Sequence, residues 1–333
     1  MVILVRILSF AFRKSLLLTS LLIIVLVSFG LISVHNNISF FTSGTADKTV
    51  SNEIELRNAI NVVSKKFTVT IDNDITLTNN PLTIPNNKDI TLTSSKTTEH
   101  NKLIGADTQE VISIENGGVL RLDGICVTHA KEDLGKGIFV QEKGKLVMYS
   151  GEISANNGGY RYEHGEGHVI AGGGVWNYGV FEMSGGTISD NKAPDEGYDC
   201  GGVQNGGSFI MSGGTISKNT VTFSGGGVYN YMYNKVGGSF IMSGGTISDN
   251  TVINGEGGGV CNSGGKFVMS GGTISDNTAN SGGGVYSVGS FTEPAFLRSC
   301  VKIVYKQDTT LYSQGQRTQQ KQQQNAYIAI TKT

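Results

Sequence analysis

The string MSGGTIS, which recurs in the second half of the chain, constrains the fold more than any other feature of the sequence. Its copies stand at Met183–Ser189, Met211–Ser217, Met242–Ser248 and Met269–Ser275, and a weaker copy, MYSGEIS, begins at Met148. Successive methionines are 35, 28, 31 and 27 residues apart. Self-similarity with a period of this size is typical of a repeat protein, in which each unit is one supersecondary element.

A second glycine-rich string lies between the copies of the first. It reads GGGVWN, GGVQN, GGGVYN, GGGVCN and GGGVYS, and residues 117–290 hold 43 of the 47 glycines. Each unit therefore contains three short segments, Val-x-Asn, Phe-x-Met and Ile-x-x-Asn, separated by glycine turns. Short apolar alternations predict strands, because successive side chains of a strand point to opposite faces.

The Phe-x-Met segments indicate which side of a strand is buried. Their outer positions are apolar in every unit, and we expect them to face a core. The middle position is expected to face solvent, and it is occupied by Arg121, Val147, Glu182, Ile210, Ile241 and Val268. Such a unit buries its apolar side only by stacking on its neighbours. The sequence thus predicts an all-β fold, a right-handed parallel β-helix of the pectin-lyase-like kind, with successive strands about 4.8 Å apart and in register.

In-register stacking places identical residues on one another. Asn191, Asn219, Asn250 and Asn277 are expected to form a ladder whose side-chain amides hydrogen-bond along the stack. Glycine pairs at the other corners accept the positive φ of tight turns.

A short helix is predicted before the first strands, within a cap and first coils that span residues 51–116. Asn52 is suited to the N-cap, and Glu55 completes a capping box. Leu56, Ile60 and Val63 then form one apolar stripe. This helix is expected to cover the open end of the stack and protect its first strand edges.

The alternation of Ile-x-x-Asn with Gly-Gly-Gly-Val resembles the repeats of chlamydial polymorphic outer-membrane proteins. It is more similar still to adhesin-like β-helix surface proteins of methanogenic archaea and some anaerobic bacteria, whose N-terminal caps the segment from Glu53 through Ile90-Thr-Leu-Thr also resembles. The resemblance covers about residues 50–290. It implies the fold strongly and the function weakly, because most members of the group have no assigned activity.

Residues 1–34 contain an uncharged apolar run, 15–34, preceded by Arg6, Arg13 and Lys14. Twenty residues at about 1.5 Å each match the hydrocarbon thickness of a bilayer. The positive-inside rule then places the rest of the chain outside. An uncleaved membrane anchor, a cleaved signal peptide and a buried helix are the three alternatives. Residues 35–50 are expected to form a linker.

The tail, residues 296–333, differs from the repeats. It carries six basic residues and one acidic residue, and 307–324 hold eight glutamines. A capping segment, with Cys300–Lys306 as a final strand, and a truncated or frameshifted end are the two interpretations. The repeats themselves are expected to occupy 117–295.

Several features of the sequence are candidate sites of chemistry. Asp190, Asp249 and Asp276 share one repeat position that Lys218 takes in another unit, which favours a structural role over paired catalytic acids. His164 and His168 are four residues apart among glycines, where no helix aligns them as metal ligands. We therefore expect no catalytic residue, no metal site and no cofactor. The net charge of −1 gives no reason to expect nucleic-acid binding.

Three insertions between repeats are the candidate ligand surface, with ordinary exposed loops as the alternative. They span Tyr160–His168, Pro194–Asp199 and Tyr231–Lys235. Insertions in repeat proteins collect on one face and often bind ligands, and tyrosine beside acids and amides suits contact with sugars or peptides. The candidate residues are Tyr160, Arg161, Tyr162, His164, His168, Asp195, Tyr198, Asp199, Tyr231 and Tyr233.

A column of residues follows the valine of each Val-x-Asn segment and is expected to point outward. It consists of Trp176, Gln204, Tyr229, Cys261 and Tyr286. Exposed stacked apolar residues mark an interaction surface or are simply good strand formers.

The sequence as a whole favours a non-enzymatic β-helix on the cell surface, either single-pass or secreted. Its expected partner is a glycan or protein of a host or neighbouring cell. The alternative is a polysaccharide lyase or glycoside hydrolase of the same fold.

Overall fold

The computed structural model describes residues 47–62, 66–78, 80–131, 133–163, 166–170, 173–193, 200–292, 302–304 and 327–331. All of them belong to one compact unit, Thr45–Thr333. The apolar run 15–34, Val63, His164 and the insertion Pro194–Asp199 lie outside the described residues. Among the helices that the structure does describe, none is both long and apolar enough to cross a bilayer.

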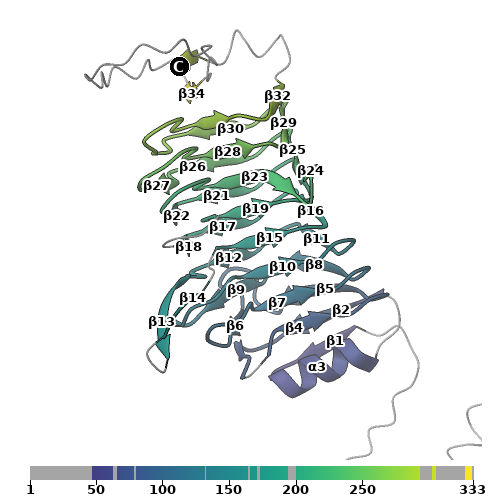
Figure 1. Ribbon diagram of the computed structural model, residues 1–333. Coiled ribbons are helices and arrows are strands. Elements are labelled where there is room, and N and C mark those ends of the chain that lie inside the picture. Colours follow the sequence, from purple (N-terminus) through teal and green to yellow (C-terminus); the bar gives the residue numbers. More distant parts are fainter. Residues whose placement is uncertain are drawn as a thin grey trace, which may run out of the picture. The chain divides into compact units, whose positions relative to one another are not determined.

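The chain winds into a parallel β-solenoid in which each turn contributes a strand to three sheets, here called A, B and C (Figure 1). The all-β, parallel β-helix prediction is confirmed at this level, and the handedness and the pectin-lyase likeness stay predictions. Sheet A contains β1 (Lys48–Val50), β2 (Lys66–Ile71), β5 (Asp89–Ser94), β8 (Val119–Asp123), β11 (Lys145–Met148), β16 (Val180–Met183), β20 (Ser208–Met211), β25 (Ser239–Met242), β29 (Lys266–Met269) and β32 (Ser290–Thr292).

The other two sheets repeat the same stacking. Sheet B contains β3 (Ile75–Thr76), β6 (Lys102–Gly105), β9 (Cys126–His129), β12 (Glu152–Ser154), β17 (Thr187–Ser189), β21 (Thr215–Ser217), β26 (Thr246–Ser248) and β30 (Thr273–Ser275). The parallel part of sheet C contains β4 (Leu82–Ile84), β7 (Ile112–Ile114), β10 (Ile138–Val140), β15 (Val175–Asn177), β19 (Val203–Asn205), β23 (Val228–Tyr233), β28 (Val260–Ser263) and β31 (Val285–Ser287). A short fourth sheet, β18 (Lys192–Ala193), β22 (Thr220–Val221) and β27 (Thr251–Val252), lies between B and C in sequence.

The core is a set of columns of like residues. Phe181, Phe209, Phe240 and Phe267 are fully buried, and neighbouring rings stack with centroids 4.7–4.8 Å apart. The predicted inward and outward positions of the Phe-x-Met strands are therefore confirmed. Val147 is the exception among the middle positions, since only 4% of it is exposed.

The Met-Ser-Gly-Gly string has a steric cause. Gly186 has a φ of 79°, which L side chains rarely adopt. A Cβ there would also stand 2.5 Å from the Cε of Met148 in the preceding turn. The methionine and the second glycine therefore recur together because the side chain of one turn fills the space that the glycine of the next leaves open.

The asparagine ladder is confirmed. Each Nδ2 of Asn191, Asn219 and Asn250 donates to the Oδ1 of the next member at 2.9 Å. The ladder begins one turn earlier than predicted, at Asn156, whose Nδ2 lies 2.9 Å from Asn191 Oδ1. The Nδ1 of buried His129 in turn lies 2.9 Å from Asn156 Oδ1.

A second ladder, which the sequence analysis missed, follows the Val-x-Asn strands. Its amides bond at 2.7–2.8 Å, and the last one donates to the Ser287 hydroxyl at 3.0 Å. Its members are Asn177, Asn205, Asn230 and Asn262. All of them are fully buried, so the ladder satisfies polar groups that water does not reach.

The repeated aspartate position is a backbone corner. Asp190, Asp249 and Asp276 have φ of 57–58°, as does Lys218, and Ala155 has 53°. Aspartate and asparagine enter this left-handed region more readily than other residues that carry a Cβ. Asp249 is thus an exposed turn residue just beyond β26, rather than part of the strand that was predicted for the Ile-x-x-Asn segment.

The capping helix is confirmed as α3 (Glu53–Val62). The Asn52 Oδ1 accepts the Glu55 N–H at 3.0 Å, and Glu55 reaches back to the N–H of Ser51 rather than to that of Asn52. Leu56 and Ile60 are buried in the common core, so the helix closes one end of the stack (Figure 1).

The tail contributes two strands at the other end of sheet C. β33 (Lys302–Val304) lies within the predicted final strand, Cys300–Lys306. It does not pair with the last coil directly. Instead it pairs antiparallel with β34 (Tyr327–Thr331), which pairs antiparallel with β31.

Candidate binding surface

The insertion Tyr160–His168 is not the irregular loop that its glycines suggested. It forms an antiparallel hairpin of β13 (Gly159–Glu163) and β14 (Glu166–Ile170), in which Arg161 pairs with His168 and Tyr160 with Val169. The Tyr-Arg-Tyr run has the aromatic composition that favours strands. The hairpin leaves the solenoid between sheets B and C and projects from one side of it in Figure 1.

The insertion Tyr231–Lys235 lies at a different corner, between sheets C and A. It prolongs β23 and turns back into β24 (Val236–Gly237). Asn234 and Lys235 both have positive φ, 47° and 64°, which is the backbone of a two-residue hairpin turn whose twist matches its strands.

The two described insertions therefore lie at different corners of the solenoid. The remaining insertion, with Asp195, Tyr198 and Asp199, follows β18 and belongs in sequence to the same corner as the β13–β14 hairpin, but it lies outside the described residues. The strands β13 and β14 thus lie at one corner and β24 at another (Figure 1). The first pair carries Tyr160, Arg161, Tyr162 and His168, and β23, which leads into β24, carries Tyr231 and Tyr233.

Most of the column that was expected to be exposed is covered. Tyr229, Cys261 and Tyr286 are 6%, 2% and 9% exposed, and Gln204 is 5% exposed. The glycine-rich segment that precedes each strand folds across the column. A Cβ on Gly225 would stand 2.6 Å from the Tyr229 Cβ, and one on Gly257 would stand 2.6 Å from the Cys261 Cβ. The column therefore forms a second, smaller apolar core, to which Cys200 and Tyr231 also belong.

The N-terminal end of the column, at Trp176, is partly exposed. Phe139 pairs in register with Trp176 on the outer side of sheet C. The Lys136 ammonium lies 4.2 Å from the centroid of Trp176 and 5.3 Å from that of Phe139. A cation at such distances over ring faces is attracted by about 0.5–2 kcal/mol.

Two tyrosines extend this aromatic surface. Tyr178 stacks on Tyr233 at a centroid distance of 4.1 Å and meets Phe139 edge-on at 5.7 Å. The stack exists because the turn between them carries Gly206, where a Cβ would lie 2.8 Å from the Tyr233 Cβ and 3.1 Å from the Tyr178 Cδ1. We call Phe139, Trp176, Tyr178 and Tyr233 the aromatic patch.

The aromatic patch includes only one residue of the predicted ligand surface, Tyr233. Trp176 belongs to the predicted outward column, whereas the sequence analysis gives no prediction for Phe139, Tyr178 and Lys136. Aligning the sequence turn by turn would have found Phe139, because it occupies in one turn the position that Trp176 occupies in the next. Tyr231 instead stacks on Tyr229 at 5.2 Å and packs with the smaller core.

The described cysteines are not activated nucleophiles. Burial raises the pKa of Cys126 to about 11 and that of Cys261 to about 12, and it raises the pKa of Cys200 further. A thiol must ionise to act as a nucleophile or a metal ligand. Across the described parts of the chain, no three His, Cys, Asp or Glu side chains gather closely enough to hold a metal ion.

No family model, no curated protein and no solved structure matches the chain. The likeness to adhesin-like β-helix proteins therefore rests on the motifs quoted above.

Proposed function

We propose that the chain is a non-enzymatic, surface-exposed binding module that holds an extended glycan on the aromatic patch. The observation that carries the proposal is the aromatic patch itself. Four partly exposed rings from three turns, within a run of four consecutive turns, gather on the outside of a regular solenoid, and one of them, Tyr233, belongs to an insertion that the repeat does not need.

The dimensions and chemistry of the aromatic patch suit a chain of sugars. Four consecutive turns extend over about 14 Å at about 4.8 Å per strand. Ring faces present a flat apolar surface to the C–H faces of sugars, and tyrosine hydroxyls add hydrogen bonds at the edge. The Lys136 ammonium supplies further donors beside Trp176.

We further propose that this module is held at the outer face of a membrane by residues 1–34, or is secreted after their removal. The partner would then be a glycan of a host or neighbouring cell, in the manner of an adhesin. Protease added to intact cells should digest the body beyond Asp47 in either case. Protection of the body from external protease would contradict this placement.

The binding proposal is tested by probing a panel of immobilised polysaccharides with the full chain. Trp176→Ala and Tyr233→Ala should each weaken retention about tenfold or more, because each removes a stacking ring. Phe223→Ala is the matched control, since Phe223 is 43% exposed but lies beyond β22 at another corner. Equal retention of all three variants would contradict the proposal.

The same experiment separates binding from catalysis. A retained polysaccharide should show no new reducing ends and no unsaturated products after long incubation. Their appearance would favour the alternative, a hydrolase or lyase of this fold.

A further inference from the structure

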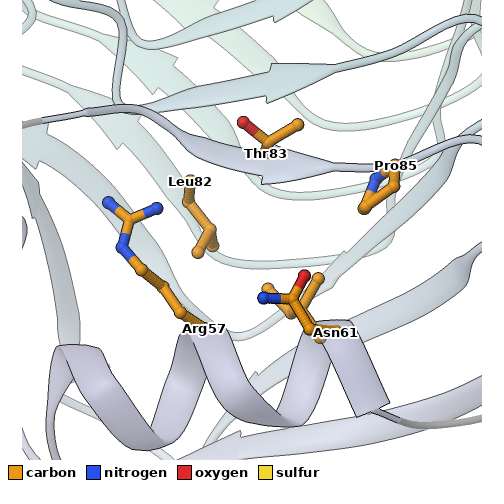
Figure 2. Close-up of a pocket in the computed structure, with 6 residues that line it drawn as sticks. Arg57, Asn61, Leu82, Thr83 and Pro85 are labelled. Atoms are coloured by element: carbon orange, nitrogen blue, oxygen red, sulfur yellow. The ribbon is translucent and has the colours of Figure 1, made fainter.

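A cavity of about 230 Å³ lies between the capping helix and the first strand of sheet C. Figure 2 shows Arg57 and Asn61 rising from α3 toward Leu82, Thr83 and Pro85. Cavities for drug-sized ligands measure about 300–1,000 Å³. This cavity is smaller, so it has room for a single small ring.

The lining combines an apolar floor with polar groups at the rim. Ile60 and Leu82 are 2% and 1% exposed and form the floor with the ring of Pro85. The other lining residues are Asn61, Thr83 and Arg57, which carry an amide, a hydroxyl and a guanidinium. One apolar face with hydroxyl and amide partners at its edge matches a sugar ring, which has C–H groups on its faces and hydroxyls around its edge.

The charge at this cavity argues for a neutral ligand. The Arg57 Nε donates to Glu53 Oε1 at 2.9 Å, and its Nη1 donates to the Pro81 carbonyl at 3.0 Å. Its charge is therefore balanced by Glu53, whose carboxylate form is favoured because hydrogen bonds from Arg57 and Thr78 outweigh burial and hold its pKa below the ordinary value. Among the described residues that line the cavity, no charged side chain is left unpaired to select an acidic sugar, and the Lys88 Nζ beside them donates to the Asn61 carbonyl at 3.3 Å.

The cavity and the aromatic patch lie along the same column of sheet C. Thr83 pairs with Ser113, Ser113 with Phe139, and Phe139 with Trp176. Two strand spacings of about 4.8 Å therefore separate Thr83 from Phe139. A glycan that follows the solenoid axis over the aromatic patch would reach the cavity with its end.

We propose that this cavity binds one neutral pyranose ring and serves as the terminal subsite for the glycan on the aromatic patch. The link to the patch rests on the proposed function, but occupancy of the cavity by a single sugar does not.

The first test concerns the cavity alone. The full chain, labelled with ¹⁵N, is titrated with glucose, mannose and galactose, and with glucuronate as the charged comparator. The amides of Arg57–Asn61 and Leu82–Thr83 should shift with at least one neutral sugar and less with glucuronate. Absence of shifts with every neutral sugar, or a stronger response to glucuronate, would overturn the proposal.

The second test separates the cavity from the proposed function. The double variant Asn61→Ala, Thr83→Val removes two polar partners and leaves Arg57 and the helix contacts intact. It should weaken binding of neutral hexasaccharides such as cellohexaose, mannohexaose and xylohexaose about tenfold, the effect of one or two hydrogen bonds. Thr91→Val, the same change on the outer face of sheet A, is the control and should have no effect.

The outcomes of the second test are distinct. If Trp176→Ala weakens hexasaccharide binding and the double variant does not, the terminal subsite is refuted and the proposed function stands. If the neutral monosaccharides occupy the cavity and Trp176→Ala changes nothing, the proposed function fails and the cavity remains a sugar site by itself.

Discussion

The side-chain oxygen of Asn250 accepts two hydrogen bonds from Asn219, one from its backbone N–H at 3.1 Å and one from its Nδ2 at 2.9 Å. Asn250 Nδ2 in turn donates to the Ile216 carbonyl and to Asn277 Oδ1. One fully buried amide thus joins three successive turns. The ladder is therefore a continuous polar connection inside an apolar stack.

Replacing Asn250 by leucine should lower the free energy of unfolding by about 1–3 kcal/mol, because the donors of Asn219 lose their buried acceptor. Denaturant unfolding of the full chain measures the change. Asp249→Gly is the neighbouring control, since Asp249 is exposed and has a φ of 57°, which glycine adopts freely. Equal losses from the two variants would contradict the burial assigned to the ladder.

The lysine at the repeated aspartate corner should be less suitable there than the aspartates of the other units. Lys218 has a φ of 57° without the local hydrogen-bonding side chain that makes aspartate and asparagine tolerant of this region. Lys218→Asn should therefore raise the free energy of unfolding by up to about 1 kcal/mol. Lys192→Asn, on β18, is the control for loss of a lysine charge. A decrease in stability for Lys218→Asn would show that its side chain has another role.

The solenoid could be predicted because identical residues recur at matching positions of successive units. The residue types at Phe181, Phe209 and Asn219 recur at the same position of the next turn. One member of a column therefore predicts where the next member lies and which face of the strand it is on. The capping helix was also predictable, since Asn52 and Glu55 give its start locally. These features depend on neighbours in sequence or on exact repetition.

Other features depend on which turns become neighbours. Tyr178 and Tyr233 come from different units and meet only because Gly206 lies between them. The burial of Tyr229 depends on whether the glycine-rich segment before it folds over the tyrosine or turns away from it. The composition of that segment is compatible with both paths. The hairpin β13–β14 was missed because its glycines and charges resemble those of an irregular loop.

The buried thiols should be inert in the folded chain. The raised pKa of about 11 for Cys126, against an ordinary 9.0, leaves about a hundredfold less thiolate at pH 8. A chain with Cys300→Ser should thus react with iodoacetamide at Cys126, Cys200 and Cys261 only after denaturation, as read by peptide mass spectrometry. Rapid alkylation of the native chain would contradict their burial.

The attachment of the capping helix should weaken in acid. Burial by itself would raise the pKa of Glu53, but its hydrogen bonds with Arg57 and Thr78 outweigh that effect and lower the pKa below 4.5. The carboxylate therefore contributes its full stabilisation above that ordinary value, and the contribution is lost as the pH falls through the lowered pKa of the folded state.

Hydrogen exchange of the α3 amides between pH 6 and pH 3 measures this loss. Protection should decrease below about pH 4.5 in the wild type and depend less on pH in Glu53→Gln, which is already weakened. Glu99→Gln, at an exposed position, should behave as the wild type. A wild-type profile in Glu53→Gln would mean that the ion pair with Arg57 contributes nothing.

Gly206 offers the most direct test of how the aromatic patch is built. Its φ is not in the left-handed region, so the backbone tolerates an L side chain and a substitution acts through its contacts with the Tyr233 Cβ and the Tyr178 ring. Gly206→Ala should destabilise the chain by about 1–3 kcal/mol, the usual effect of overpacking. It should also weaken glycan retention, because the Tyr178–Tyr233 stack is forced apart. In a Tyr233→Gly background, which removes the Tyr233 Cβ as well as its ring, the same alanine meets only the Tyr178 ring, and its effect on both stability and retention should shrink. If the effect of Gly206→Ala is the same in both backgrounds, the Tyr178–Tyr233 stack does not depend on the absence of a side chain at position 206. The aromatic patch would then be held together by other contacts.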